Sequence, residues 1–96
     1  MYGTIARLRV TPGKHEELRQ LGQEVAPQIP GFVFEHVYQM AADPNELYLV
    51  VAFESEQAYR ANADSPEQHR EYERLRALLD AEPEWHDGEI IDSYPA

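Results

Sequence analysis

The chain has 96 residues, with 8 Lys and Arg against 18 Asp and Glu, a formal net charge of −10 and no cysteine. This length allows one domain, which we expect to span residues 1–96, and the charge disfavours nucleic acid and anionic membranes as partners because both repel an acidic protein. The absence of cysteine excludes disulfides, a thiolate nucleophile and thiolate metal ligands. We find neither a signal-peptide pattern nor an apolar run of membrane-spanning length, so we expect a cytoplasmic protein.

The first predicted elements are a strand and a helix. Apolar and polar side chains alternate over residues 2–10, which is typical of a strand with one buried face. Thr11 is then a suitable N-cap, Pro12 a suitable first helical residue, and Pro27 a suitable end for the helix that follows.

Two further strands are predicted next. Residues 31–40 alternate again, and residues 41–46 contain the Asp-Pro-Asn turn chemistry of a hairpin, so the second and third strands should be antiparallel neighbours. The third strand, residues 47–53, is apolar without interruption. A strand with one solvated face would alternate, so both faces of this strand must be covered.

Two short helices and a last strand complete the prediction. Ser55 and Ser65 are expected N-caps, and Gln68 completes a capping box with Ser65. Residues 88–94 alternate and are read as the fourth strand, and the acidic residues 80–92 as a mainly solvated connection.

The resulting order, βαββααβ, predicts an α+β, ferredoxin-like subunit whose helices cover one face of an antiparallel sheet. The other face would stay bare in a monomer, although residues 47–53 require a dry environment there. We therefore expect a homodimer in which a second copy of the sheet covers that face.

Three segments also carry a family resemblance: TPGKHEEL, PGFVFEHVYQMAADPNELYLVVAFESEQAY and SPEQHREY. In order and spacing they resemble the antibiotic biosynthesis monooxygenase (ABM) family of dimeric α/β barrels, over about residues 3–94. The resemblance implies a homodimer with a pocket between sheet and helices in each subunit. It also implies one of several activities: cofactor-free oxygenation of polyphenolic rings, haem degradation, quinol oxidation, or no catalysis.

The residues favour the ring-oxidising branch over the haem-degrading branch. Haem-degrading members use an Asn on the first strand, a Trp in the second helix and a His in the third. Here the first strand has no Asn, and the helical position is close to Asn62, so only His69 fits. Ring-oxidising members use helical Asn, Trp and Tyr groups, and Asn62 and Tyr72 match two of these. The single Trp, Trp85, falls in the acidic connection and matches neither branch.

Oxygenation without a cofactor needs a base for a phenol, hydrogen bonds to the resulting anion and an apolar cleft. We expect His69 or His36 to be the base, and Asn62 and Tyr72 to be hydrogen-bond donors. This oxygenation requires no cofactor, and the expected substrate is a small aromatic molecule. The residues expected to bind it are Phe32, Phe34, His36, Tyr38 and Arg76.

Each of these residues also has a purely structural interpretation. His36 is often a satisfied core histidine, Asn62 a helix terminator and the aromatic stripe of the second strand plain packing. The local group of His86, Asp87 and Glu84 lacks the spacing that directs ligands to one point, so no metal site is predicted. The alternative function is a non-catalytic dimeric module that binds a small ligand or supports another protein.

One structural observation separates the two functions. A pocket that reaches His69, Tyr72 and Asn62 favours the enzyme. A cleft filled by aromatic and leucine side chains favours the module.

Overall fold

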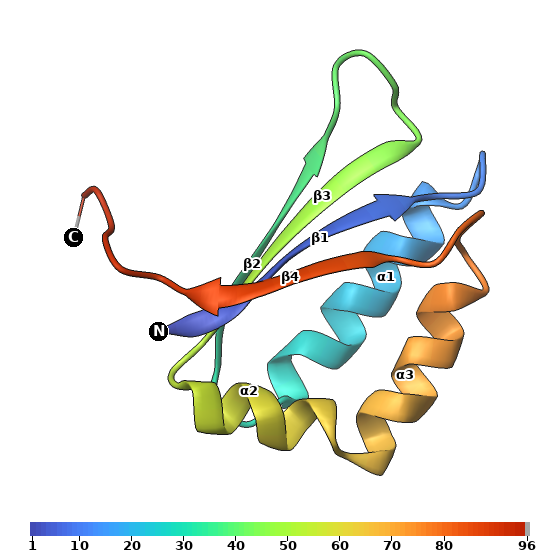
Figure 1. The fold of residues 1–96 in the computed structure, drawn as a ribbon. Coiled ribbons are helices and arrows are strands. Elements are labelled where there is room, and N and C mark those ends of the chain that lie inside the picture. Colours follow the sequence, from blue (N-terminus) through green and yellow to red (C-terminus); the bar gives the residue numbers. More distant parts are fainter. Residues whose placement is uncertain (96) are drawn as a thin grey trace.

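A computed structural model describes residues 1–95. Four strands and three helices follow one another as β1 Tyr2–Arg9, α1 His15–Val25, a 3₁₀ turn Ala26–Gln28, β2 Phe32–Gln39, β3 Glu46–Phe53, α2 Glu56–Ala63, α3 Pro66–Arg76 and β4 Glu84–Glu89. The α+β, ferredoxin-like prediction is therefore confirmed. Figure 1 shows all three helices on the same side of the sheet.

The strands lie in the order β2-β3-β1-β4, and every neighbouring pair is antiparallel. Ala6 of β1 is paired with Leu49 of β3 and with Trp85 of β4, and Leu49 is paired with Val37 of β2. Directly paired residues point to the same side of a sheet. These four side chains therefore lie on the face that the helices cover, here called the helix face. The opposite side, which no helix covers, is called the open face.

The fully buried core is small and lies at one end of the sheet. Its cluster consists of Ala6, Leu8, Val10, Leu47 and Leu79. Leu79 follows α3 and forms an isolated bridge with Val10, which ties the last helix to the end of β1. None of the three α-helices contributes a fully buried residue. The space between helices and sheet is therefore only partly filled.

The start of α1 differs from the prediction. The helix begins at His15, and its N-cap, Lys14, makes no side-chain capping bond. Residues 11–14 form a turn instead, in which the Lys14 amide donates to the Thr11 carbonyl and Gly13 adopts φ +88°. Proline followed by glycine at positive φ is typical of a type II turn. The Thr11 hydroxyl donates to Asp80 at 2.8 Å rather than capping a helix.

The starts of α2 and α3 confirm the predicted caps. Ser55 Oγ accepts from the Ala58 amide at 3.1 Å, and Ser65 Oγ accepts from the Gln68 amide at 3.0 Å. The capping box is only half present, because the Gln68 side chain accepts from Asn62 Nδ2 at 3.3 Å instead of turning back to the cap.

The predicted position of the fourth strand is wrong. β4 spans Glu84–Glu89 rather than residues 88–94, so half of the expected connection is strand. It pairs with β1 along its whole length, and Arg7 of β1 binds Glu84 at 2.9 Å. After Ile90 the chain leaves the sheet (Figure 1), and Ile91 is 90% exposed.

Candidate functional site

A cavity of about 1150 Å³ separates the helix face from the helices and opens to solvent. This volume suffices for a ligand of several fused rings. Its walls are mainly apolar: Leu8, Leu47, Leu49, Val51 and Phe53 from the sheet, Leu18, Leu21 and Val25 from α1, and Leu75 from α3. The cavity is thus suited to an aromatic molecule.

Polar side chains cross the floor of this cavity in one line. Glu35 of β2 pairs with Val51 of β3, Val51 with Thr4 of β1, and Thr4 with Asp87 of β4. All four line the cavity. We call Glu35, Thr4 and Asp87 the polar row. Since neighbouring strands lie about 4.8 Å apart, Glu35 and Thr4 are separated by about 10 Å.

Glu35 is a carboxylate without a counter-charge. It is partly buried and faces Gly22 of α1, where a Cβ would lie 3.3 Å from Glu35 Oε2. Burial raises the pKa of Glu35, and neither a hydrogen bond nor an ion pair offsets this effect within residues 1–95. A carboxyl group in such surroundings is a better proton acceptor than one in water.

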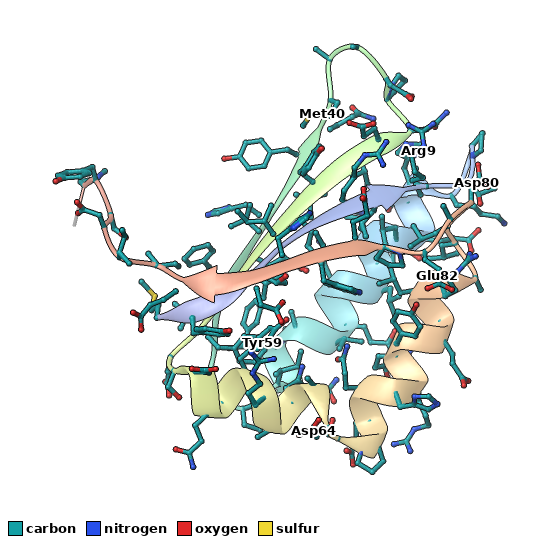
Figure 2. The ribbon with its side chains drawn as sticks, in the orientation of Figure 1. Arg9, Met40, Tyr59, Asp64, Asp80 and Glu82 are labelled. Carbon is teal, nitrogen blue, oxygen red and sulfur yellow. The ribbon has the colours of Figure 1, made fainter. Side chains whose placement is uncertain are left out.

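The other end of the row is hydrogen-bonded within the protein. Tyr59 of α2 donates its hydroxyl proton to Asp87 Oδ1 at 2.7 Å, and Arg60 approaches the second Asp87 oxygen at 3.4 Å. Figure 2 shows Tyr59 between α2 and the sheet. Burial, reinforced by the bond to Asp87, raises the pKa of Tyr59 to about 12. Thr4 is only 5% exposed. Its hydroxyl lies beside the Tyr59 oxygen, a contact that opposes the rise in the pKa of Tyr59, but it completes no hydrogen bond of regular geometry within residues 1–95.

Asn62 and Tyr72 line the cavity, but both are already bound to protein groups. The Asn62 amide donates to Gln68, and the Tyr72 hydroxyl donates to Glu82 in a short contact. This bond, more than burial, raises the pKa of Tyr72. Their assignment as substrate contacts stays a prediction.

His69 and Arg76 stand apart from the cavity interior. His69 lies at the rim, where 77% of its side chain is exposed and Nε2 is 3.4 Å from Glu73. Arg76 is not among the cavity-lining residues and instead binds Glu82 at 3.2 Å and the Leu79 carbonyl at 2.9 Å. A base at position 69 would therefore act from solvent.

The aromatic stripe of β2 lies mainly on the other side of the sheet. Phe32 lines the cavity, and Phe34 touches it at a bulge between the two residues. Phe34 also stacks on His36 at 4.9 Å, and both share the open face with Tyr38, which is 57% exposed. The expectation that the whole stripe walls the pocket is therefore corrected: after the bulge, Glu35 and not His36 or Tyr38 points to the helices.

Trp85 and Asp87 line the cavity from β4, although the sequence placed them in a connection. The signal that could have found them is the alternation of Glu84 and His86 with Trp85 and Asp87. Within residues 1–95, no group of three or more His, Cys, Asp or Glu side chains is arranged to hold a metal ion. No helix in this part of the chain is long and apolar enough to cross a membrane.

The chain is similar to known proteins in both sequence and fold. The family model of antibiotic biosynthesis monooxygenases matches residues 1–74. Among solved structures, a Chloroflexus aurantiacus J-10-fl protein provisionally designated an antibiotic biosynthesis monooxygenase is 26% identical, with a TM-score of 0.78 and coverage of 96% of this chain and 94% of that one. A search of curated proteins finds no match.

Two more distant structures show the same fold. The cofactor-independent oxygenase SnoaB from Streptomyces nogalater, solved as an asparagine-to-alanine mutant, is 18% identical with a TM-score of 0.82, over 99% of this chain and 97% of that one. The protein Rv0793 from Mycobacterium tuberculosis is 21% identical with a TM-score of 0.75, over 96% of both chains.

Proposed function

Because this chain belongs to the antibiotic biosynthesis monooxygenase family, we propose that it is a cofactor-independent monooxygenase that oxidises a small phenolic or quinol-type aromatic in the cavity between sheet and helices. The observation that carries this proposal is the cavity itself. It is apolar, large enough for fused rings, and reaches Asn62 and Tyr72 without being filled by side chains.

The substrate supplies the electrons in this chemistry. For an anthrone-type substrate, the methylene carbon between two aryl rings takes up O₂, and the products are the ketone and water. Loss of a substrate proton makes the ring system electron-rich enough to reduce O₂. The protein has to accept that proton, hold the anion in an apolar site and provide hydrogen bonds to its oxygens.

Asn62 and Tyr72 have different hydrogen-bonding capacities in this site. An amide nitrogen has two donor hydrogens, and Asn62 uses one for Gln68, so the second is available to a ligand oxygen. Tyr72 gives its only proton to Glu82. The bond from Tyr72 and then the ion pair with Arg76 lower the pKa of Glu82, which keeps Glu82 ionised. Tyr72 can then accept a hydrogen bond from a ligand hydroxyl.

We also propose that two copies of the open face meet in a homodimer. Proteins of this family are generally dimeric. The open face carries Ile5, 49% exposed, and Tyr38, 57% exposed, beside Tyr48 and Val50. Apolar area of this kind favours a self-complementary contact about a two-fold axis. A cytoplasmic location likewise stays a prediction.

Oxygen uptake tests the proposed activity. Purified protein freed of metal and flavin should accelerate aerobic oxidation of anthrone or a substituted hydroquinone relative to heat-denatured protein. Asn62→Ala should lower kcat/KM by about 5–100-fold, as expected for one lost hydrogen bond to a charged transition state. Asn45→Ala, in the hairpin outside the cavity, is the matched control. Equal uptake by native and denatured protein across a panel of phenols would reject the oxygenase.

A ligand-binding module without catalysis is the second candidate. It is favoured by the internal hydrogen bonds of Asn62 and Tyr72 and by the solvent exposure of His69. Under this alternative, phenols bind in the cavity, as measured by calorimetry, and leave it chemically unchanged.

A further inference from the structure

Two members of the polar row have no regular hydrogen-bond partner, and this asymmetry needs a physical reason. Asp87 is bound by Tyr59 and Arg60, whereas Glu35 has no hydrogen-bond partner within residues 1–95 and the Thr4 hydroxyl has only an irregular contact with the Tyr59 oxygen. Leaving a buried polar group unpaired costs about 1–3 kcal/mol. Valine at position 4 would fill nearly the same volume without that cost. The unpaired groups are therefore poor core residues and suitable ligand contacts.

No cation of the cavity wall neutralises Glu35. Arg19 binds Glu16, and His15 contacts the Pro44 carbonyl. On α3, Glu71 binds Arg74 and His69 approaches Glu73. The titratable groups that line the cavity besides Glu35 are His15, Arg19, Tyr59, His69, Glu71, Tyr72 and Asp87.

The helix opposite Glu35 leaves room for it. Gly22 lies inside α1, where glycine is less favourable than alanine by about 1 kcal/mol. A Cβ at this position would approach Glu35 Oε2 to 3.3 Å. The glycine thus keeps space around the carboxylate, where a ligand hydroxyl could reach it.

Toward a ligand that lies between Glu35 and Thr4, the Thr4 hydroxyl would act as a hydrogen-bond donor. Tyr59 directs its proton to Asp87, and its raised pKa keeps that proton in place at neutral pH. The Tyr59 oxygen can still accept from Thr4, but that contact lacks regular hydrogen-bond geometry, so the Thr4 hydroxyl hydrogen can turn instead to a carbonyl or phenolate oxygen of a ligand.

We propose that Glu35 and Thr4 form the two ends of a substrate-binding strip, in which Glu35 accepts the substrate proton and Thr4 donates a hydrogen bond to an oxygen at the opposite edge of the substrate. The proton-transfer part rests on the proposed monooxygenase function, whereas the binding part does not. In this step a phenolic O–H bond, or the methylene C–H bond of an anthrone, breaks, the proton moves to a Glu35 oxygen, and the electron pair stays on the substrate, delocalised onto its oxygen. The protein takes up no electrons, and O₂ remains the oxidant.

The strip also defines the class of substrate. Two interstrand steps of about 4.8 Å place the backbones at Glu35 and Thr4 about 10 Å apart, with Val51 as an apolar floor between them. A flat system of two or three fused rings with oxygen functions on opposite edges fits this spacing.

Binding is tested with 1,8-dihydroxyanthraquinone, which has three fused rings and oxygens on both edges. Thr4→Val should weaken its Kd by about 3–10-fold, the effect of one hydrogen bond. Thr11→Val, outside the cavity, is the matched control and should leave Kd unchanged. In ¹³C-carboxyl NMR titrations, the probe should shift the titration midpoint of Glu35 and leave unchanged that of Glu24, which binds Arg74 of α3 and does not line the cavity. Unchanged binding by Thr4→Val together with an unmoved Glu35 midpoint would overturn the strip.

Proton transfer is tested with anthrone. The wild-type kcat/KM should rise with pH through the pKa of Glu35, because only the carboxylate accepts a proton. Glu35→Gln should lower kcat/KM by about 10²–10⁴-fold and remove this rise, whereas Glu24→Gln should do neither. The opposite pattern, loss of the pH dependence in His69→Ala and its retention in Glu35→Gln, would refute the assignment. If wild-type protein oxidises nothing, the proposed function fails, and the probe titrations still decide whether the strip binds ligand.

Discussion

Gly22→Ala tests whether α1 leaves room for Glu35. The change removes the helix penalty of glycine, about 1 kcal/mol. The added Cβ would lie 3.3 Å from Glu35 Oε2, a few tenths of an ångström closer than an ordinary contact, and no backbone atom of another element lies within 4 Å. The contact is with the far end of a flexible side chain, so a small rotation of Glu35 relieves it. The gain from replacing glycine inside α1 should therefore exceed the cost of rotating Glu35, and we expect a net stabilisation of about 0.5–1 kcal/mol.

For a chain of this size, that gain corresponds to a rise in Tm of about 2–8 °C. Thermal unfolding followed by circular dichroism, at equal protein concentration and pH 7, measures it. Gly13→Ala is the contrasting control, because its site has open space but φ +88°, where alanine is strained and Tm should fall. Since Glu35 is displaced, Gly22→Ala should also lower kcat/KM for anthrone. A clearly lower Tm for Gly22→Ala would show that the Glu35 side chain has no free space into which it can rotate. That result would contradict the open space inferred around its carboxylate.

Further predictions concern the sheet and its polar row. Gly3→Ala should lower the free energy of unfolding, measured by denaturant titration, by at least about 3 kcal/mol, because its Cβ would lie 1.7 Å from the Val51 carbonyl oxygen. Gly88 pairs with Gly3 on β4, but a Cβ there meets nothing within 4 Å, so Gly88→Ala should fold normally. Val50→Asp should convert the proposed dimer to a folded monomer in light scattering; an intact dimer would reject the open-face interface. Asp87→Asn should lower the pKa of Tyr59 from about 12 in absorbance titrations near 295 nm. Because that pKa exceeds the unfolded value of about 10, wild-type stability should fall between pH 10 and 12.

Local signals in the sequence were sufficient for most of the fold. Alternation identified β1 and β2, and the turn residues followed by an apolar run identified β3. The serine caps of α2 and α3 lie within three residues of the amides they bind. The start of α1 was missed because the Thr11 hydroxyl bonds to Asp80, far away in sequence, and Gly13 turns the chain. β4 was misplaced because its residues are polar and exposed, so pairing with β1 rather than apolar content determines where it lies.

The candidate site was only partly predictable, because some of its contacts join elements that are far apart in the sequence. Asn62 and Tyr72 were expected at the pocket and do line the cavity. Alternation in β2 showed which side chains share a face, but not which face the helices cover, so the aromatic stripe was expected to wall the pocket and Glu35 was not expected there. The contact of Glu35 with Gly22 joins two elements across the cavity, and no local pattern encodes it.

The absence of fully buried residues in α1, α2 and α3 has a consequence for motion. The buried cluster joins β1, β3 and the segment after α3, so the amides of β1 and β3 should exchange with deuterated water only on global unfolding. The helices are held to the sheet by partly buried contacts and should exchange earlier, by moving as units away from the cavity. Such sub-global opening would provide a route by which a flat ligand enters and leaves without unfolding of the sheet.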